Sequence, residues 1–490
     1  DLNINRCRGY IYMRRLSKQS AIVGCGLALS TSTFICQSAG ATPPAPIDIQ
    51  GVQQGVIYSP QIHAILTDPS TGTILQGNGT YGGYGSLASS YSGSGPYYDI
   101  QGYLDTGTSG ILLSENAQAG MGVSLATYNG TPVTYTDTGI GGAASYNVST
   151  PYDVSTAQLS SGNYSVQPPT TAYTNNIGAV QMETSTSGGY NIFGMPVMQG
   201  KVTVFQPGNF TDLANPIPTA AYIYNPGTSY NPNELNTNPG IVPTTYKVQL
   251  SFASLFSPSL IQPTGAPGPV EDANPFIGPN PLDPQGSTAA IPPVSITYTE
   301  PTTSGGITRT STGSFLFDTG AQLSFISTAE AANLGISQIT DSSGNTTLVF
   351  TDTGKPVPNQ FTSSASGAGG SSTSPLGFYL DSLTLQTTTG QDIVFLSAPV
   401  AVMDVTVTNP ITGQPLTLNG DLGMNFFETG GLTSQDTNGF QWFTLDQPNG
   451  LLGLTLAPSV PEPSAVLLLL VSIGALTLIR RRSWHISIED

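Results

Sequence analysis

YLDTGTSGILLS, residues 103–114, is the stretch that decides the fold of this chain, because it returns later with the same order of features. The second copy, residues 315–327, reads FLFDTGAQLSFIS. In each copy an apolar strand runs into Asp-Thr-Gly, and apolar residues follow the loop. The repeat predicts that one structural unit occurs twice. It also predicts buried loops at Asp105 and Asp318, and a carboxylate held at the end of a buried strand is a candidate functional group.

The similarity continues beyond each loop. Ser114 and Ser327 each stand nine positions after their Asp and can cap a short helix. A Gly follows seventeen positions after each Asp and can supply a left-handed helix stop. The predicted helices are 115–119 and 328–332, and the predicted stops are Gly122 and Gly335.

Two further Asp-Thr-Gly triplets show that the triplet alone identifies no site. Asp137 and Asp352 each follow a strand-like run and a Thr, and each leads into polar or Gly-rich sequence. Asp and Gly favour turns because they hydrogen-bond locally or accept positive φ. We therefore expect both triplets to be hairpin turns.

The repeat predicts two similar lobes, at about 50–205 and 240–457. Near the end of each lobe stands an apolar–Gly motif, NIFGMPVM at 191–198 and DLGMNFF at 421–427. A Pro- and Asn-rich connection, 206–290, overlaps the start of the second lobe. We expect it to be loop or linker apart from one strand-like run, Tyr246–Phe252.

The composition indicates an all-β protein. Only 8% of the 490 residues are charged, and the chain has 57 Gly and 39 Pro, which favours short strands and many turns. All three cysteines precede residue 37, so thiol catalysis and a Cys-based zinc site are not expected. A Ser-His-Asp triad would have to use His63, which we expect to be an ordinary strand residue.

The charge balance excludes one class of partner. Between residues 42 and 459 there are 25 acidic and four basic residues, a net charge of −21. Such a surface repels phosphates, so no nucleic acid is expected to bind. It suits a soluble protein that is secreted or held at the cell surface.

Both ends of the chain carry targeting features. The first, residues 1–41, has a basic segment around Arg14, an apolar or small run and a small-residue cleavage site, which predicts a signal peptide. At the other end VPEPS, 460–464, precedes an apolar stretch, 465–479, and three Arg residues. A membrane anchor is the alternative at either end, although the C-terminal stretch is short for a bilayer of about 30 Å.

The C-terminal order, 460–482, resembles the PEP-CTERM sorting signal. The resemblance implies an exosortase as a partner of this tail and a transient membrane anchor at residues 465–479. It further implies a bacterial protein that is exported through an inner-membrane intermediate to the cell surface or the medium.

The paired loops, each followed by an apolar–apolar–Gly motif, resemble those of the aspartic peptidases, over nearly all of the chain between the targeting segments. The duplication in one chain is similar to pepsin-like enzymes, and the DTGA and LGMNF sequences are similar to retropepsins. The resemblance implies two similar β-rich lobes of the pepsin-like fold, with a cleft between them. It implies a polypeptide substrate, Asp105 and Asp318 as the catalytic pair, and no metal or other cofactor.

The same resemblance assigns supporting roles around the pair. Thr106 and Thr319 would brace the two loops through hydroxyl-to-backbone hydrogen bonds. Gly107 and Gly320 let backbone amides approach the carboxylates. Thr108 can stabilise a carboxylate, but its counterpart Ala321 cannot. Loss of one donor should raise the pKa values of the pair, so we expect a mildly acidic optimum.

A flap over the substrate is expected from the Gly-rich region 139–152. Tyr146 is the candidate flap residue, with Tyr135 and Tyr152 as competitors. The corresponding region of the second copy, 363–374, is either a second flap or a loop.

Two other functions remain open from the sequence. One is a catalytically inactive surface or matrix protein on the same two-lobed scaffold. The other is an unrelated β-rich adhesin with fortuitous motifs, against which the matched spacings argue.

Overall fold

The computed structural model describes residues 44–52, 54, 59–77, 96–139, 142–158, 175–186, 189–207, 219–227, 246–254, 261–263, 287–302, 305–367, 372–408, 415–428 and 439–456. The chain divides into two units, 1–43 and 44–490, and every described residue belongs to the second. The expected signal peptide, 1–41, and sorting tail, 460–482, lie outside the described residues. Among those described, no helix is long and apolar enough to cross a membrane.

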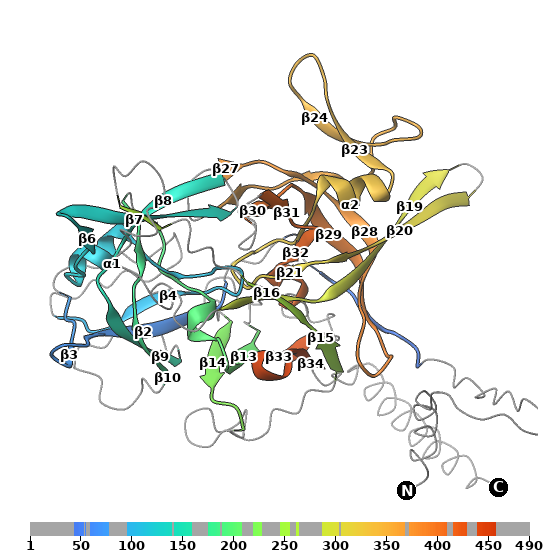
Figure 1. Ribbon diagram of the computed structural model, residues 1–490. Helices are drawn as coiled ribbons and strands as arrows, with labels where there is room; N and C mark the ends of the chain where they lie inside the picture. The colour runs from blue at the N-terminus through green and yellow to red at the C-terminus, as the bar shows by residue number, and fades with distance from the viewer. Residues whose placement is uncertain are drawn as a thin grey trace, which may run out of the picture. The chain divides into compact units, whose positions relative to one another are not determined.

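The described residues are mainly β-strands, which confirms the all-β prediction. One sheet has nine strands (Figure 1). Its central path is β20 (Gly305–Ser314), β19 (Pro293–Thr302), β28 (Leu376–Leu385), β29 (Ile393–Val402), β22 (Phe325–Ile326), β32 (Gly420–Leu422) and β21 (Leu316–Phe317). At its sides, β1 (Ile47–Ile49) pairs with β29, and β25 (Phe361–Thr362) pairs with β28.

A second, larger set of strands closes on itself. Its strands are β2 (Gln61–Asp68), β3 (Thr73–Ile74), β4 (Ile100–Leu104), β5 (Ile111–Leu113), β6 (Thr127–Tyr128), β7 (Thr131–Gly139), β8 (Gly142–Val148), β9 (Tyr152–Gln158), β10 (Asn175–Val180), β11 (Glu183–Thr184), β12 (Ile192–Phe193), β13 (Val202–Gln206), β14 (Ala220–Tyr224), β15 (Tyr246–Gln249), β17 (Ile261–Pro263), β33 (Phe440–Asp446) and β34 (Leu451–Leu456).

Four two-stranded pairs complete the described strands. They are β16 (Ser251–Ser254) with β18 (Thr288–Ile291), β23 (Ile336–Thr340) with β24 (Thr346–Phe350), β26 (Ala365–Ser366) with β27 (Ser372–Thr373), and β30 (Thr406–Thr408) with β31 (Pro415–Thr417). The β23–β24 hairpin projects beyond the neighbouring strands (Figure 1).

The two predicted helices are present with their predicted caps. They are α1 (Glu115–Gly120) and α2 (Thr328–Asn333). The Ser114 hydroxyl accepts a hydrogen bond from the backbone of Ala117, and the Ser327 hydroxyl accepts one from Glu330, both at 3.1 Å. The predicted stops, Gly122 and Gly335, have φ values of +67° and +75°. These local predictions succeeded because caps and stops depend on short-range hydrogen bonds.

The prediction for residues 206–290 was wrong in its strand content. This connection contributes β14, β15, β16 and β17, and β18 begins at its end. The expected run Tyr246–Phe252 is divided between β15 and β16. Most of these strands pair with partners far away in the sequence, as β15 does with β34 and β17 with β7. Such pairing overrides the weak strand propensity of a Pro- and Asn-rich segment.

Of the two Asp-Thr-Gly triplets predicted to be hairpin turns, one lies in a turn and the other does not. Asp352 lies in a turn, where the amide of Gly354 donates to the carbonyl of Phe350 at 2.7 Å. Asp137 does not, because it lies inside β7 and pairs with Ala144 of β8. The pairing of β7 with β8 continues past Asp137 to Gly139, which lies opposite Gly142.

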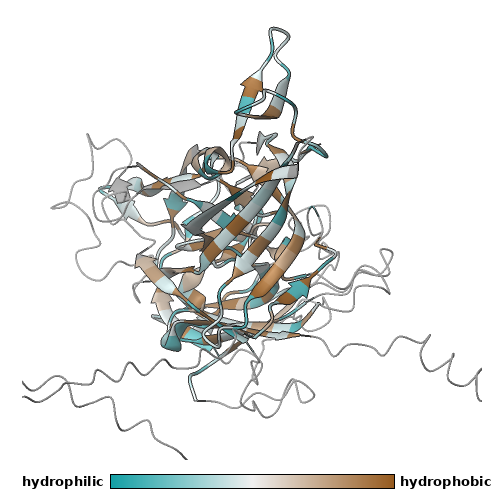
Figure 2. Ribbon diagram, turned by 90° about the vertical axis from the view of Figure 1, so that its right-hand side faces the viewer, coloured by the Kyte–Doolittle hydropathy of each residue, from teal (hydrophilic) through white to brown (hydrophobic). Residues whose placement is uncertain are grey.

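One hydrophobic core contains residues of both copies of the repeat. Phe205 of β13 stacks on Phe443 of β33, with ring centroids 4.9 Å apart. Phe317, which directly precedes Asp318, packs edge-on against Phe205 and Phe427. Figure 2 shows hydrophobic bands alternating with polar ones along the strands, as expected of sheets with one face on a core. Phe317 therefore anchors the start of the second Asp-Thr-Gly loop in the hydrophobic core.

Candidate active site

The two Asp-Thr-Gly loops sit on frames with the same connectivity. In the first copy β12 lies between β4, to which it is parallel, and β5, to which it is antiparallel. In the second copy β32 lies in the same way between β21 and β22. The amide of Asp105 donates to Phe193 at 3.0 Å, and that of Asp318 donates to Leu422 at 3.1 Å. The backbone of each Asp is thus held by the equivalent strand.

Thr106 and Thr319 bind the two loops to each other. The amide of Thr106 donates to the Thr319 hydroxyl at 3.1 Å, and the amide of Thr319 donates to the Thr106 hydroxyl at 3.0 Å. Each hydroxyl also donates at 2.6 Å to a carbonyl of the opposite copy, that of Phe317 or Leu104. Both threonines are fully buried. This is the hydroxyl-to-backbone brace that the resemblance implied.

The brace brings the carboxyl groups of Asp105 and Asp318 together, and their side chains are hydrogen-bonded to each other. Each Gly lies against the opposite carboxyl group. A β-carbon at Gly107 would stand 2.6 Å from Oδ2 of Asp318, and one at Gly320 would collide with the carboxyl group of Asp105. Both positions therefore require Gly for close approach. Asp105 and Asp318 are each half-buried.

The hydrogen bonds to the two carboxyl groups differ. Asp105 accepts from the amide of Gly107 at 2.7 Å and from the hydroxyl of Thr108 at 2.6 Å. Asp318 accepts from the amides of Gly320 at 2.7 Å and Ala321 at 3.2 Å, both on Oδ1. The first copy supplies a side-chain donor from its own loop, and the second does not.

The pKa of Asp105 is raised well above its usual value of 3.8. Shielding from water is the largest cause, and the charge of Asp318 and the hydrogen bond to it add to the effect. The Thr108 and Gly107 hydrogen bonds act in the opposite direction. These causes are those expected of two neighbouring carboxyl groups that share a proton.

A third carboxyl group, which the sequence analysis missed, belongs to the same cluster. Asp421 of β32 is 1% exposed, and its side chain is hydrogen-bonded to that of Asp318. Shielding, followed by the charges of Asp318 and Asp105, raises the pKa of Asp421 well above 3.8. The sequence does contain a sign of this group: the motif that ends in Gly has the apolar Ile192 in the first copy, whereas the second copy has the acidic Asp421 at the corresponding position.

The candidate flap residue is buried. Tyr146 lies in β8, opposite Tyr135 of β7, and is 4% exposed. It packs against Leu112 and Ile192, which belong to the first frame. Tyr146 thus lies beside the first loop, while residues 140–141 at the end of the β7–β8 hairpin are outside the described part. In the second copy β26 and β27 form a hairpin at the corresponding place.

Other chemistry-bearing groups lie apart from this cluster. His63 is a strand residue, as expected, and its Nδ1 contacts the carboxylate of Asp99, which the sequence did not predict. Within the described ranges, no group of three or more His, Cys, Asp or Glu side chains has the arrangement of a metal site.

Comparison of the chain with models of known protein families gave no match, and comparison with curated proteins gave none either.

Proposed function

We propose that this protein is an aspartic-type endopeptidase. The observation that carries the proposal is the pairing of Asp105 and Asp318, hydrogen-bonded through their side chains on two braced, duplicated loops. Two carboxyl groups that are hydrogen-bonded to each other cannot both be ionised without a large cost in free energy, so they share a proton. A pair that holds one proton and one charge is suited to general acid–base hydrolysis of a peptide bond.

The proposed architecture is two similar lobes of the pepsin-like type, with a substrate cleft between them. Its support is the matching order of strands around the two loops and the matching helices α1 and α2. The β7–β8 hairpin with Tyr146 is the proposed flap, because it is anchored beside the first loop.

In the proposed reaction the charged carboxylate takes a proton from a bound water, and the resulting hydroxide adds to the scissile carbonyl carbon. The protonated carboxyl group gives its proton to the carbonyl oxygen. The tetrahedral intermediate then collapses: one of its hydroxyl groups returns a proton to the carboxylate that acted as the acid, the C–N bond breaks, and the departing nitrogen receives a proton from the carboxyl group that acted as the base. One water is consumed, one new carboxyl and one new amine are formed, and the pair returns to its starting state. These steps use only the two carboxyl groups and water.

We further propose that the peptidase is exported and handled by an exosortase through its C-terminal tail, residues 460–482. The proposal rests on the sequence of the two termini and on the strongly acidic composition. Deletion of residues 460–482 should alter the partition between membrane, surface and medium, as fractionation of cells expressing the full chain would measure.

The peptidase proposal is tested by digestion of casein and of a peptide library by the purified protein over a range of pH. Asp105→Asn and Asp318→Asn should each abolish cleavage while leaving the fold intact. Cleavage that survives both substitutions would exclude this mechanism. A folded wild-type protein with no cleavage at any pH would favour the inactive scaffold protein instead.

A further inference from the structure

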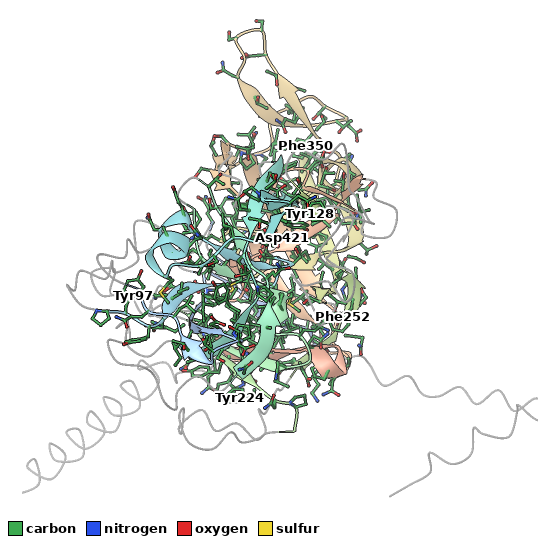
Figure 3. All side chains as sticks on the ribbon, turned by 60° about the vertical axis from the view of Figure 1, so that its left-hand side comes forward. Tyr97, Tyr128, Tyr224, Phe252, Phe350 and Asp421 are labelled. Carbon is green, nitrogen blue, oxygen red and sulfur yellow. The ribbon has the colours of Figure 1, made fainter. Side chains whose placement is uncertain are left out.

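Asp421 is held at the second loop by the backbone. In β32 it pairs with Leu316 on one side and with Phe325 on the other. The next residue, Leu422, accepts the backbone hydrogen bond from Asp318. Figure 3 labels Asp421, which is 1% exposed. Its Oδ1 is buried and has no hydrogen-bond partner among the described residues.

Among the differences between the two copies, two concern side chains beside the carboxyl groups, and they complement each other. The first copy has a hydroxyl at Thr108, which donates to Asp105, and an apolar side chain at Ile192, which packs with Leu112. The second copy has no hydroxyl at the corresponding Ala321, but it has a carboxyl group at Asp421, which corresponds to Ile192. This carboxyl group interacts with Asp318.

We propose that the carboxyl group of Asp421 replaces the missing hydroxyl at Ala321, donates its proton in a hydrogen bond to Asp318, and thereby keeps the negative charge of the site on Asp318. This inference rests on the proposed function. It makes Asp421 a positioning residue, since it acts on the reaction through Asp318.

In this proposal the three carboxyl groups share two protons and one negative charge. Asp105 and Asp421 carry the protons and donate them in hydrogen bonds to Asp318. Asp318 is then the base that accepts the proton of water, and Asp105 is the acid that protonates the carbonyl oxygen. Asp421 keeps its proton throughout, so the balance of the reaction is unchanged.

No other charged group competes for this role among the described residues. The groups that act on Asp421 are Asp318 and Asp105. Glu330 of the nearby α2 is bound instead to Ser311 and Asn419. No cation forms a salt bridge with any of the three carboxyl groups in the described part of the chain.

The test uses three variants of the full chain. Asp421→Ile introduces the residue of the first copy and removes the donor. Asp421→Asn keeps a donor of the same size without an acidic proton. The double variant Ala321→Thr/Asp421→Ile gives the second loop the Thr–Ile combination of the first copy. The readout is the pH dependence of kcat/KM on one peptide substrate.

Loss of the donor makes Asp318 harder to ionise, so Asp421→Ile should move the acidic limb of the profile upward by about one pH unit or more. Asp421→Asn and the double variant each supply a donor to Asp318 and should return the limb most of the way to its wild-type position. An acidic limb that stays in place in Asp421→Ile, or that moves equally in Asp421→Asn, would overturn the inference.

A second readout separates this inference from the proposed function. Titration of ¹³C-labelled Asp carboxyl groups by NMR follows ionisation of the carboxyl cluster without turnover. Asp421→Ile should raise the midpoint at which the cluster acquires its first negative charge, and the double variant should restore it. An absence of peptidase activity would count against the proposed function alone, whereas an unmoved midpoint would count against the role of Asp421 alone.

Discussion

Thr106 and Thr319 each use one hydroxyl twice, as acceptor for an amide and as donor to a carbonyl of the other copy. All four hydrogen bonds are buried, so each broken one leaves a polar group without water. The relative position of the two carboxyl groups therefore depends on the hydroxyl groups of these two threonines. Their roles could be predicted from the motif, but the third carboxyl group could not be predicted from the paired triplets alone.

Substitution of Thr106 by Val should be costly because it leaves the Thr319 amide and the Phe317 carbonyl unpaired. We expect a loss of about 2–4 kcal/mol in the free energy of unfolding, measured by chemical denaturation. Thr106→Ser keeps the hydroxyl and should lose much less. Equal losses in the two variants would show that the methyl packing, and not the brace, is responsible.

The pH profile of cleavage follows from the raised pKa of Asp105. In the proposed mechanism this group acts as the acid, and a raised pKa then keeps it protonated to a higher pH and extends the active range upward. The optimum should therefore be mildly acidic. A rate profile that peaks near pH 2, as in strongly acidic pairs of this kind, would contradict this expectation.

At the scale of elements, the short-range features were predictable and the long-range pairings were not. The helices, their Ser caps and their Gly stops were all found, because each depends on a few consecutive residues. Apart from the run at Tyr246–Phe252, the strands of 206–290 were not predicted, because most of them pair with strands elsewhere in the chain. The prediction that Asp137 lies in a hairpin turn was wrong, because the Gly that follows it, Gly139, is the last residue of a strand and not part of a turn.

The helix caps give a prediction at this scale. Ser327→Ala removes the acceptor for the Glu330 amide at the start of α2 and should cost about 1 kcal/mol of stability. Ser327→Thr keeps an accepting hydroxyl and should cost less. Thermal unfolding of the two variants beside the wild type measures the difference, and an equal effect would indicate that packing of Ser327 dominates.

At the scale of the whole described unit, segments far apart in sequence hold each other in place. The connecting segment, residues 206–290, contributes β15, which pairs with the last described strand, β34. Phe205 of β13 stacks on Phe443 of β33. The Thr219 hydroxyl contacts the buried carboxyl group of Glu428, another link of this kind. None of these pairings could be read from composition or local pattern, because each joins residues that carry no shared motif.

Glu428 makes stability depend on pH. Shielding raises its pKa from 4.5 to about 8. Between these values the folded state holds a proton that the unfolded state has lost, so the wild type loses stability as the pH rises. Glu428→Gln should therefore gain stability relative to the wild type over this range, by at most about 5 kcal/mol. A difference in unfolding free energy that is constant with pH would contradict this.

The central claim, that Asp105 and Asp318 hydrolyse peptide bonds as a pair, is tested most directly by one comparison. It measures kcat/KM on a single peptide for the wild type, Asp105→Asn, Asp318→Asn and Asp352→Asn, the last being a matched control in a turn with the same Asp-Thr-Gly sequence. The account predicts a loss of about 10²–10⁴-fold or more in the first two variants and near wild-type values in the third. Comparable activity in all four proteins would contradict it.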